Sequence, residues 1–543
     1  MGTNLSKIRR EKMLNTISKI KETIDDEETL KNLCLIEHEL TKKKYGLLWE
    51  EHEEKVDEEL KTKIPTFEEV KEKEIVSNQN NNFNFLLEGD NLHSLYLLEK
   101  THKEKIDIIY IDPPYNTGNK DFIYDDCMID REDGFSHSKW LSFMEKRLNI
   151  AKKLLKENGV IFISIDDYEQ APLKMLCDDI FGEDNFIADI IWKRKRGRDN
   201  SARWFSKAHE YCLVYSKNKN LFDVNKVAIS EDSDTRKSYK NPDNDPRGDY
   251  RKLGCWARGT QGGVKYDFTL NDGYYFYERL WLMSKENLKK LDDENKLVRV
   301  GDKLYRKFFI TEHKGQVPET IWDDVSNSAN ASDMIKKMFN GNIIFDTAKP
   351  VEYIKRMIQI GCQKDATILD FFAGSGTTAQ AVLELNKEDN GNRQFILCTN
   401  NENNICEDIT YQRIKTVITG KRKDYTEYSE GIDTNLKYYK TTYIPRINTE
   451  EENIQENLLL NIQNLIQLEN GIRVDNERIK VVLEEEKLDT FSLNIEEVEK
   501  CERLYISSDI LLTTKQVKTF KDNNVEVYMI PEYYFDSEIK EVQ

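Results

Sequence analysis

The sequence lacks three features that mark common classes of protein. No apolar run approaches the roughly 20 residues of a membrane-spanning helix, and the first residues contain no apolar segment of a secretory signal. The nine cysteines form no Cys-x-x-Cys pair, which disfavours zinc and indicates reduced thiols. No Walker loop is present, so any ATP-dependent step needs another polypeptide. We expect a cytoplasmic protein without a membrane contact or a metal site.

The chain also has an excess of negative charge. A formal net charge of −18 is unfavourable for binding to nucleic acid, but the distribution of charge decides. Residues 186–315 contain 28 Lys/Arg against 19 Asp/Glu, an excess of nine positive charges. This region includes a basic run that we expect to bind DNA phosphates, with a solvated face as the alternative: Lys193, Arg194, Lys195, Arg196 and Arg198.

The first candidate site follows Ile106 to Ile111, a short stretch rich in β-branched residues that predicts a buried strand. Next comes Asp112-Pro-Pro-Tyr115, whose prolines lack N–H donors and favour an extended backbone. The Asp112 carboxylate and the Pro113 carbonyl are then two free acceptors, which suits an exocyclic amine. Tyr115 offers a flat face to a base. A simple turn is the alternative, so these four residues need support from a second motif.

The second motif lies between Ala366 and Thr378. Ile368 and Leu369 end a predicted strand, Asp370 begins a turn, and Gly374-Ser-Gly376 lets the backbone approach a ligand closely. A helix is predicted from Thr377, so the order is strand, glycine turn and helix. This order is typical of a nucleotide-binding sheet with its ligand at the carboxyl ends of the strands. The turn is too short to cradle phosphates, which favours a cofactor without them.

Together, Asp112-Pro-Pro-Tyr115 and Asp370-x-Phe-x-Gly-x-Gly376 resemble the signature motifs of amino-methyltransferases that use S-adenosylmethionine. The catalytic motif precedes the cofactor motif, as in the β class of DNA methyltransferases. The initial Asp resembles adenine-N6 enzymes, whereas cytosine-N4 enzymes more often have Ser. Over residues 45–425, the chain resembles the modification (Mod) subunits of type III restriction–modification systems. The local match runs through Gly89-Asp-Asn91, Ile111 to Gly118, Ser136 to Trp140 and Ile161 to Asp167.

The resemblance implies a role for each motif residue. It assigns catalysis to Asp112, Pro113, Pro114 and Tyr115, and cofactor binding to Asp370, Phe372, Gly374, Gly376, Asp90, Asn91, Lys349 and Pro350. Asp90 also suits the N-cap of a helix, and the two roles are compatible. Related sheets place an acid after the second cofactor strand for the ribose hydroxyls. Glu402 is the candidate here, although it is displaced along the chain.

Alternating strands and helices predict an α/β protein with a doubly wound, mostly parallel sheet and a possible antiparallel edge. The resemblance implies an S-adenosylmethionine-dependent methyltransferase sheet in circularly permuted order. The expected domains are a helical N-terminal arm (1–75), a first catalytic part (76–225), an inserted target-recognition domain (226–340), a second catalytic part (341–425) and a C-terminal domain (426–543). A purely structural insert is the alternative for residues 226–340.

The resulting hypothesis is methyl transfer from S-adenosylmethionine to N6 of a flipped adenine in double-stranded DNA. The chain would be the modification and recognition subunit of a type III system, beside an ATP-dependent helicase–nuclease. The alternatives are a solitary adenine methyltransferase and a cytosine-N4 methyltransferase. The helical arm packs on its own chain or on a second subunit, and we expect a homodimer.

Overall fold

The computed structural model describes residues 5–21, 24, 26–41, 49, 54–78, 82–117, 123–124, 127–128, 136–225, 234–257, 262–312, 315–342, 344–345, 347–445, 451–507 and 509–530. Gly118, the last residue of the extended first motif, lies outside them. The chain divides into two compact units. The first comprises residues 1–222, 320–355 and 363–543, and the second comprises residues 223–319 and 356–362.

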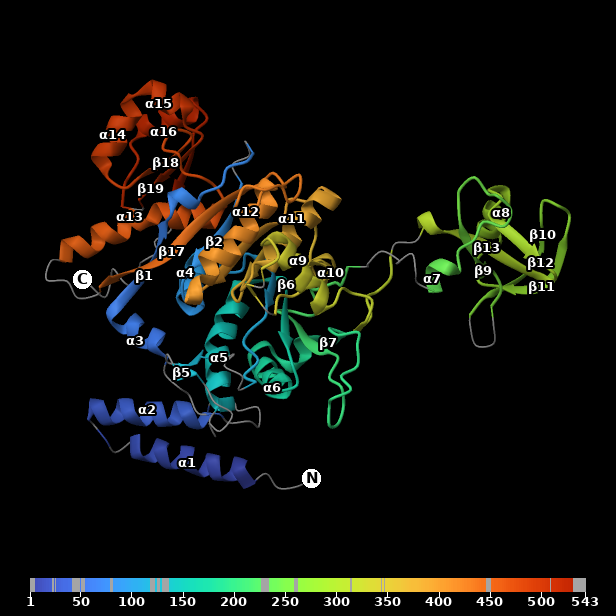
Figure 1. The fold of residues 1–543 in the computed structure, drawn as a ribbon, viewed down its shortest axis with the longest axis horizontal. Helices are drawn as coiled ribbons and strands as arrows, with labels where there is room; N and C mark the ends of the chain where they lie inside the picture. The colour runs from blue at the N-terminus through green and yellow to red at the C-terminus, as the bar shows by residue number, and fades with distance from the viewer. Residues whose placement is uncertain are drawn as a thin grey trace. The chain divides into compact units, whose positions relative to one another are not determined.

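A ten-stranded sheet organises the first unit (Figure 1). In spatial order its strands are β1 (Lys63–Glu69), β17 (Asn435–Pro445), β2 (Phe83–Glu88), β16 (Gln394–Thr399), β15 (Thr367–Asp370), β3 (Ile106–Ile111), β6 (Leu155–Ile165), β8 (Glu210–Ser216), β7 (Phe186–Trp192) and β14 (Ile321–Trp322). Of these, β1 and β8 run against the others. The expected mostly parallel sheet is confirmed, and β8 places an antiparallel strand inside it.

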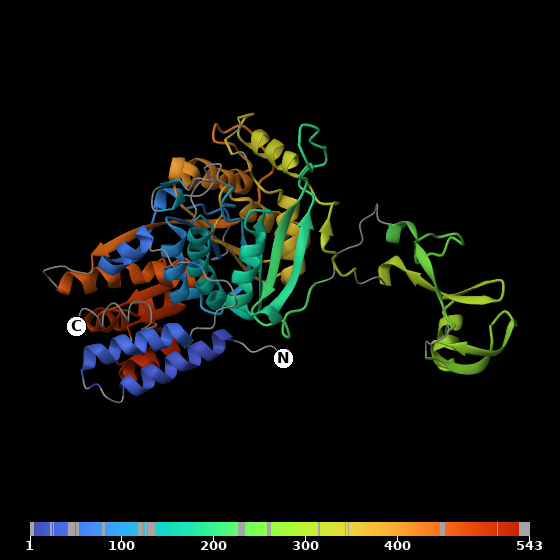
Figure 2. The same ribbon diagram turned by 90° about the horizontal axis from the view of Figure 1, so that it is seen from below.

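Helices cover both faces of the sheet (Figures 1 and 2). Along β3, Ile109 and Ile111 join the largest hydrophobic core, whereas Ile108 and Tyr110 point to the other face because neighbouring side chains alternate. The first face carries α4 (Asn91–His102), α5 (Ser136–Leu154), α6 (Gln170–Phe181) and α13 (Glu451–Asn470). The second carries α11 (Thr377–Asp389) and α12 (Tyr411–Thr419), whereas α10 (Val351–Gly361) is divided between the two compact units. Both faces are therefore buried, as a largely parallel sheet requires.

Three strands of the large sheet come from segments outside the two predicted catalytic parts. β1 falls within the predicted arm, after α1 (Leu5–Lys21), α2 (Glu27–Thr41) and α3 (Lys55–Thr62). β17 falls within the predicted C-terminal domain and pairs with both β1 and β2. β14 and α9 (Ser328–Met338) fall within the predicted insert but belong to the first unit, since Ile321 and Trp322 pair with β7. The insert's compact unit therefore ends near residue 319.

Four smaller sheets occur in the described chain, and one of them is the short pair of β4 (Ile123–Tyr124) and β5 (Cys127–Met128). The second unit has β9 (Tyr250–Gly254), β12 (Leu297–Val300) and β13 (Lys303–Phe309) in one sheet and a β10 (Val264–Thr269)–β11 (Tyr275–Trp281) hairpin, with α7 (Asp234–Lys237) and α8 (Lys285–Asp293). The C-terminal part has a parallel sheet of β18 (Ile479–Val482), β19 (Arg503–Ile506) and β20 (Glu526–Met529), with α14 (Glu485–Leu493), α15 (Ile495–Lys500) and α16 (Thr514–Asp522). No helix among the described residues is long and apolar enough to cross a membrane.

Candidate active site

The carboxyl ends of two neighbouring strands meet at one cavity. β3 and β15 run parallel with Ile108 opposite Ile368, so Asp112 and Asp370 emerge at the same edge of the sheet. A cavity of about 720 Å³ opens there, a volume typical of small-molecule sites. Its lining combines the two sequence motifs: Asp112, Pro113, Pro114 and Tyr115 from the first, and Asp370, Phe372 and Gly374 from the second. The fold thus joins two motifs that lie far apart in the sequence.

A cluster of charged side chains surrounds Asp112 in this cavity. Lys349 Nζ lies 2.7 Å from both carboxylate oxygens of Asp112 and 2.8 Å from the Tyr115 hydroxyl. The same hydroxyl is 2.9 Å from Asp112 Oδ1 and 3.2 Å from Glu210 Oε2. Glu210 lies 3.5 Å from Lys349 Nζ and accepts a hydrogen bond from Arg194 on its other oxygen. The charges of two carboxylates and two cations therefore offset one another around the Tyr115 hydroxyl.

Burial and ion pairing compete in this cluster. Burial raises the pKa of Asp112 above its ordinary value, and Lys349 acts in the opposite direction. Burial disfavours charge on Lys349, but the Asp112 and Glu210 carboxylates raise its pKa. Burial also acts to raise the pKa of Glu210, but Lys349 and Arg194 outweigh it and the pKa lies below its ordinary value. The cluster holds Lys349 and Glu210 charged beside a carboxyl that protonates more easily than usual.

The backbone after Asp112 is held by side chains of α5 and by Glu169, the residue before α6. The Trp140 indole N–H donates to the Pro114 carbonyl at 2.7 Å. Asn116 adopts a left-handed conformation with φ of 56°, and its amide donates to Glu169 Oε1 at 2.6 Å. His137 Nδ1 lies at the same distance from that oxygen. These contacts give the first motif a defined shape rather than that of a mobile turn.

The second motif forms a tight loop at the end of β15. Asp370 accepts hydrogen bonds from the Phe372 N–H at 3.0 Å and from the Thr378 hydroxyl. Burial raises the pKa of Asp370 to about 7 despite these two donors. Gly374 and Gly376 have φ of 47° and 75°, in the left-handed region that favours glycine. A Cβ on Gly374 would lie 3.5 Å from the Phe345 ring, which is also in the cavity wall.

A helical segment supports this loop from behind. The π-helical turn Ile405–Thr410 precedes α12, and the Thr410 hydroxyl donates to the Gly374 carbonyl. The guanidinium of Arg413 is fully buried and donates to Thr377 Oγ1 at 2.7 Å and Ser375 Oγ at 3.1 Å. Burial lowers the pKa of Arg413 to about 10. The loop is therefore held by a buried cation as well as by its own turn geometry.

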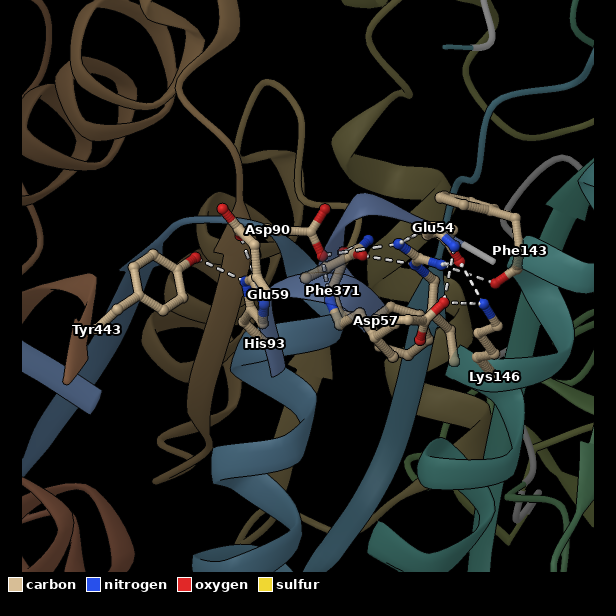
Figure 3. A network of polar contacts seen from close by, with 12 residues as sticks. Glu54, Asp57, Glu59, Asp90, His93, Phe143, Lys146, Phe371 and Tyr443 are labelled. Carbon is tan, nitrogen blue, oxygen red and sulfur yellow. Dashed lines mark hydrogen bonds and ion pairs between the residues drawn. The ribbon is translucent and has the colours of Figure 1, made fainter. Parts of the chain in front are cut away.

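A polar network links the same loop to the segment before β1 (Figure 3). The Asn91 amide donates to the Phe371 carbonyl at 2.9 Å, and Arg147 Nε donates to Asn91 Oδ1 at 2.6 Å. Arg147 is fully buried, and its two terminal nitrogens each lie 3.0 Å from an oxygen of Glu54. Its guanidinium also covers the Phe143 ring at 3.5 Å. Glu54 thus reaches the second motif through Arg147 and Asn91.

The remaining predicted residues lie outside the cavity wall. The Asp90 carboxylate accepts a hydrogen bond from the Leu92 N–H at 2.7 Å. Asp90 is therefore the N-cap of α4, one of its two predicted roles. Asn91 contacts the Phe371 carbonyl, and a Cβ added at Gly376 would lie 3.1 Å from the Thr410 side chain. Within the described chain, the cavity lining also omits Pro350 and the exposed Glu402. Of the basic run, Arg194 lines the cavity, and the other four residues are exposed: Lys193, Lys195, Arg196 and Arg198.

The structure adds a contact for Lys349 and a site residue, Glu210, that sequence reasoning did not assign. The ammonium of Lys349 contacts Asp112, and Lys349 also lines the cavity that the glycine loop shares, so its cofactor contact stays a prediction. Glu210 was treated only as the start of a strand. Because β8 is antiparallel, its first residue lies at the edge where the parallel strands end. A lone acid at the start of an apolar strand was the available signal. Among the described residues, no cluster of potential metal ligands occurs.

Comparison with known proteins agrees with this geometry. The DNA methylase family model matches residues 106–444. The StyLTI Mod subunit of Salmonella typhimurium is 40% identical, over 59% of this chain and 52% of that protein. The type II methyltransferase M.KpnI of Klebsiella pneumoniae is 39% identical, over 58% and 79%. The EcoPI Mod subunit of Escherichia phage P1 is 34% identical, over 69% and 66%. The chain thus spans about half of the StyLTI subunit and two thirds of the EcoPI subunit.

Among solved structures, the PvuII DNA methyltransferase (cytosine-N4-specific) aligns with a TM-score of 0.33 at 12% identity, covering 62% of this chain and 91% of that one. The family assignment rests on the sequence matches. The family model covers more than half of the chain and includes both motifs that line the cavity. This chain belongs to the DNA methylase family.

Proposed function

We propose that this protein transfers a methyl group from S-adenosylmethionine to N6 of adenine in double-stranded DNA. The observation that carries the proposal is the shared cavity, which Asp112 and Pro113 of the first motif line together with the glycine loop of the second. The relatives named as Mod subunits and type II methyltransferases support the reaction class. We further propose that the chain serves as the modification subunit of a restriction–modification system, with a separate restriction subunit, and that it forms a homodimer.

The residues present fit S-adenosylmethionine at the second motif. The Gly374 backbone is left-handed and open to the cavity, and Phe372 adds an aromatic ring to the wall. Asp370 and Asn91 hold the loop from either side through the Phe372 N–H and the Phe371 carbonyl. We propose that Asp370, Phe372 and Gly374 contact the cofactor, with Gly376, Asp90 and Asn91 shaping the loop. Pro350 and Glu402 stay predictions. When bound, the cofactor supplies an electrophilic methyl group.

The first motif acts on the base. An adenine inside a duplex cannot enter this cavity, so it must be flipped out of the stack. We propose that the flipped base stacks on Tyr115, and that its amine donates one hydrogen to Asp112 and one to the Pro113 carbonyl. Pro114 holds the motif through the Trp140 contact. Fixed acceptors orient the nitrogen lone pair without a covalent intermediate.

Lys349 Nζ contacts both oxygens of Asp112, and the Tyr115 hydroxyl adds a second donor only on Oδ1. Because a carboxylate oxygen accepts about two hydrogen bonds, we propose that the amine donates to Oδ2. Glu210, 3.5 Å from the same ammonium, helps to hold it in the site. The amine loses one proton during the reaction. The raised pKa of Asp112 suits this carboxyl to accept that proton. Lys349 then contributes to charge balance around Asp112, and its cofactor contact stays a prediction.

The test uses Asp112→Ala beside a matched variant of an exposed carboxylate, Asp408→Ala, which pairs with Lys423 on the surface. Asp112→Ala should reduce methyl transfer by roughly 100-fold or more, because an acceptor for the reacting amine is lost. Calorimetry should show near-normal affinity for S-adenosylmethionine, and Asp408→Ala should behave as wild type. More than half of wild-type turnover in Asp112→Ala would contradict the assignment. Nucleoside analysis of the product separates N6-methyladenine from N4-methylcytosine.

A further inference from the structure

The loop that joins β7 and β8, residues 193–209, carries two adjacent aromatic side chains in solvent. Trp204 is 81% exposed and Phe205 is 92% exposed. Both side chains are large and apolar, and an exposed pair of this kind usually marks a contact surface. The guanidinium of Arg203 lies 5.2 Å from the Trp204 ring centroid, which adds a cation beside the aromatic face.

The loop has a fixed stem and a short tip. β7 and β8 pair antiparallel up to Trp192 and Glu210. Beyond the sheet, the Lys195 N–H donates to the Ala208 carbonyl at 3.2 Å, and the Asp199 N–H donates to Ser206 Oγ at 2.7 Å. These contacts leave residues 200–205 as the tip, and Figure 2 shows the loop extending beyond the two strands. The aromatic pair is therefore presented on a braced hairpin.

The stem of this hairpin belongs to the active-site cavity. Arg194 lines the cavity and pairs with Glu210, which in turn contacts the Tyr115 hydroxyl. Lys207 pairs with Asp167 at 3.1 Å and lies over the ring of Tyr168 in the cavity wall. Phe205 lies five positions before Glu210, so its Cα lies within about 17 Å of the Cα of Glu210, a member of the cluster around Asp112.

The positive charge of the loop suits a polyanionic partner such as DNA. Residues 193–209 contain seven Lys/Arg and one Asp, in a chain whose net charge is −18. A polyanion that reaches the cavity meets these cations first. Aromatic side chains stack on bases of any sequence. In other DNA-binding proteins, apolar side chains insert between neighbouring base pairs that have been partly unstacked. Cations along the stem with aromatics at the tip match a duplex at the position where one base has left the stack.

We propose that Trp204 and Phe205 form a wedge that enters the DNA duplex and fills the gap left by the flipped adenine. The exposed cations of the stem hold the adjoining phosphates. This inference rests on the proposed function and assigns a step that Asp112 and Tyr115 do not perform. The wedge stabilises the opened duplex, whereas the cavity holds the extruded base.

The test compares Trp204→Ala/Phe205→Ala with Tyr425→Ala, which removes an equally exposed aromatic ring elsewhere (81% exposed). Sequencing of DNA from cells that express the protein first locates the methylated site. Two duplexes then carry this site, one fully paired and one with cytosine opposite the target adenine. The mispair lowers the cost of flipping. Steady-state methyl transfer is measured on both, together with the fluorescence of 2-aminopurine at the target position.

On the paired duplex, the double variant should lose at least about tenfold in kcat/KM and most of the fluorescence rise, because the opened stack is no longer filled. On the mispaired duplex, its deficit relative to wild type should shrink to about threefold or less. Tyr425→Ala should match wild type on both, and S-adenosylmethionine affinity by calorimetry should be unchanged in all variants. Lys195→Ala/Arg198→Ala should instead lose activity equally on the two duplexes and weaken the salt dependence of binding.

Equal losses of the double variant on both duplexes would overturn the wedge and leave only a contribution to affinity. If the double variant keeps activity within about twofold of wild type on the paired duplex, the wedge proposal is overturned as well. This holds also if the variant has lost binding to a protein partner, because the aromatic pair would then be a protein contact. A wild-type protein that binds S-adenosylmethionine but methylates no DNA would overturn the proposed function and this inference together.

Discussion

At the scale of single residues, the site combines residues that are neighbours in the sequence with residues that lie far apart in it. Asp112 can be predicted because its strand, prolines and aromatic follow one another within ten residues. Its ion-pair partner Lys349 lies 237 residues away, and only the folded chain brings the two side chains together. Glu210 reaches the same cavity because β8 runs against its neighbours. No local pattern specifies the direction of a strand, so this carboxylate could not be assigned from the sequence.

Asp370 makes stability depend on pH. Burial raises its pKa from 3.8 to about 7 in the folded protein. Between these values the folded state binds one proton more than the unfolded state, so the free energy of unfolding falls as pH rises, by about 1.4 kcal/mol per pH unit. The stabilisation is complete below the unfolded pKa and is lost as pH rises through the folded one. Asp370→Asn removes this titration.

We expect the stability of wild type relative to Asp370→Asn to decline from about pH 4 to about pH 7 and to stay level above that. Denaturant unfolding of both proteins across this range, without cofactor, measures the difference. The exposed Asp408→Asn variant is the matched control. Parallel stability curves for wild type and Asp370→Asn would show that the carboxyl is not buried as the structure has it.

At the scale of elements, the catalytic strand, the glycine turn and the parallel sheet follow from periodicity and turn chemistry. β17 was not recognised as part of that sheet. Lys437 in β17 is 1% exposed and pairs with Glu69 and Glu74. A buried lysine in a central strand conceals the apolar pattern by which such strands are predicted. Its acidic partners lie near residue 70, so the pairing that neutralises it is visible only in the folded chain.

The network in Figure 3 makes the segment before β1 a support for the cofactor loop. Glu54→Gln removes the carboxylate that contacts both terminal nitrogens of the buried Arg147 guanidinium and leaves only the longer contact to Asp90 at 3.7 Å. Breaking a buried pair costs up to about 3–5 kcal/mol. Asn91 then loses its fixed contact. We expect a lower melting temperature and at least about tenfold weaker binding of S-adenosylmethionine, a loss of about 1.4 kcal/mol.

Lys146→Met is the matched control, because Lys146 pairs with Asp57 and Glu54 at a partly exposed position. Exposed pairs contribute about 0–1 kcal/mol, so this variant should change both quantities little. Calorimetry with S-adenosylmethionine and thermal unfolding are measured on both proteins. If Glu54→Gln binds the cofactor as tightly as wild type, the network is structural and does not position the loop.

At the scale of the whole molecule, the chemistry and the second unit are separate bodies. We expect residues 223–319 to set the target sequence, because this segment forms a compact unit with basic and aromatic side chains between the two motifs. Replacing it with the equivalent segment of a related enzyme should move methylation to the donor's site with adenine as the product. Sequencing of methylated DNA checks this.

The bounds of that exchange come from the structure. Residues 320–340, which the sequence placed in the insert, supply β14 and α9 to the first unit and should be retained. A chimera that keeps these residues, stays active and still methylates the original site would place recognition in another part of the chain. Charge and composition located the insert, but only strand pairing could show where the sheet resumes.

The two outer strands of the large sheet also bear on how the protein avoids aggregation. β14 has only two residues, and β1 contains Pro65, which has no N–H to offer to a further strand. The Asn464 side chain of α13 donates to the Phe67 carbonyl of β1 at 2.7 Å. Both borders therefore offer few free backbone groups to a neighbouring molecule. Self-association of this protein should use side-chain surfaces, and crowded expression in cells should not extend the sheet from one copy to the next.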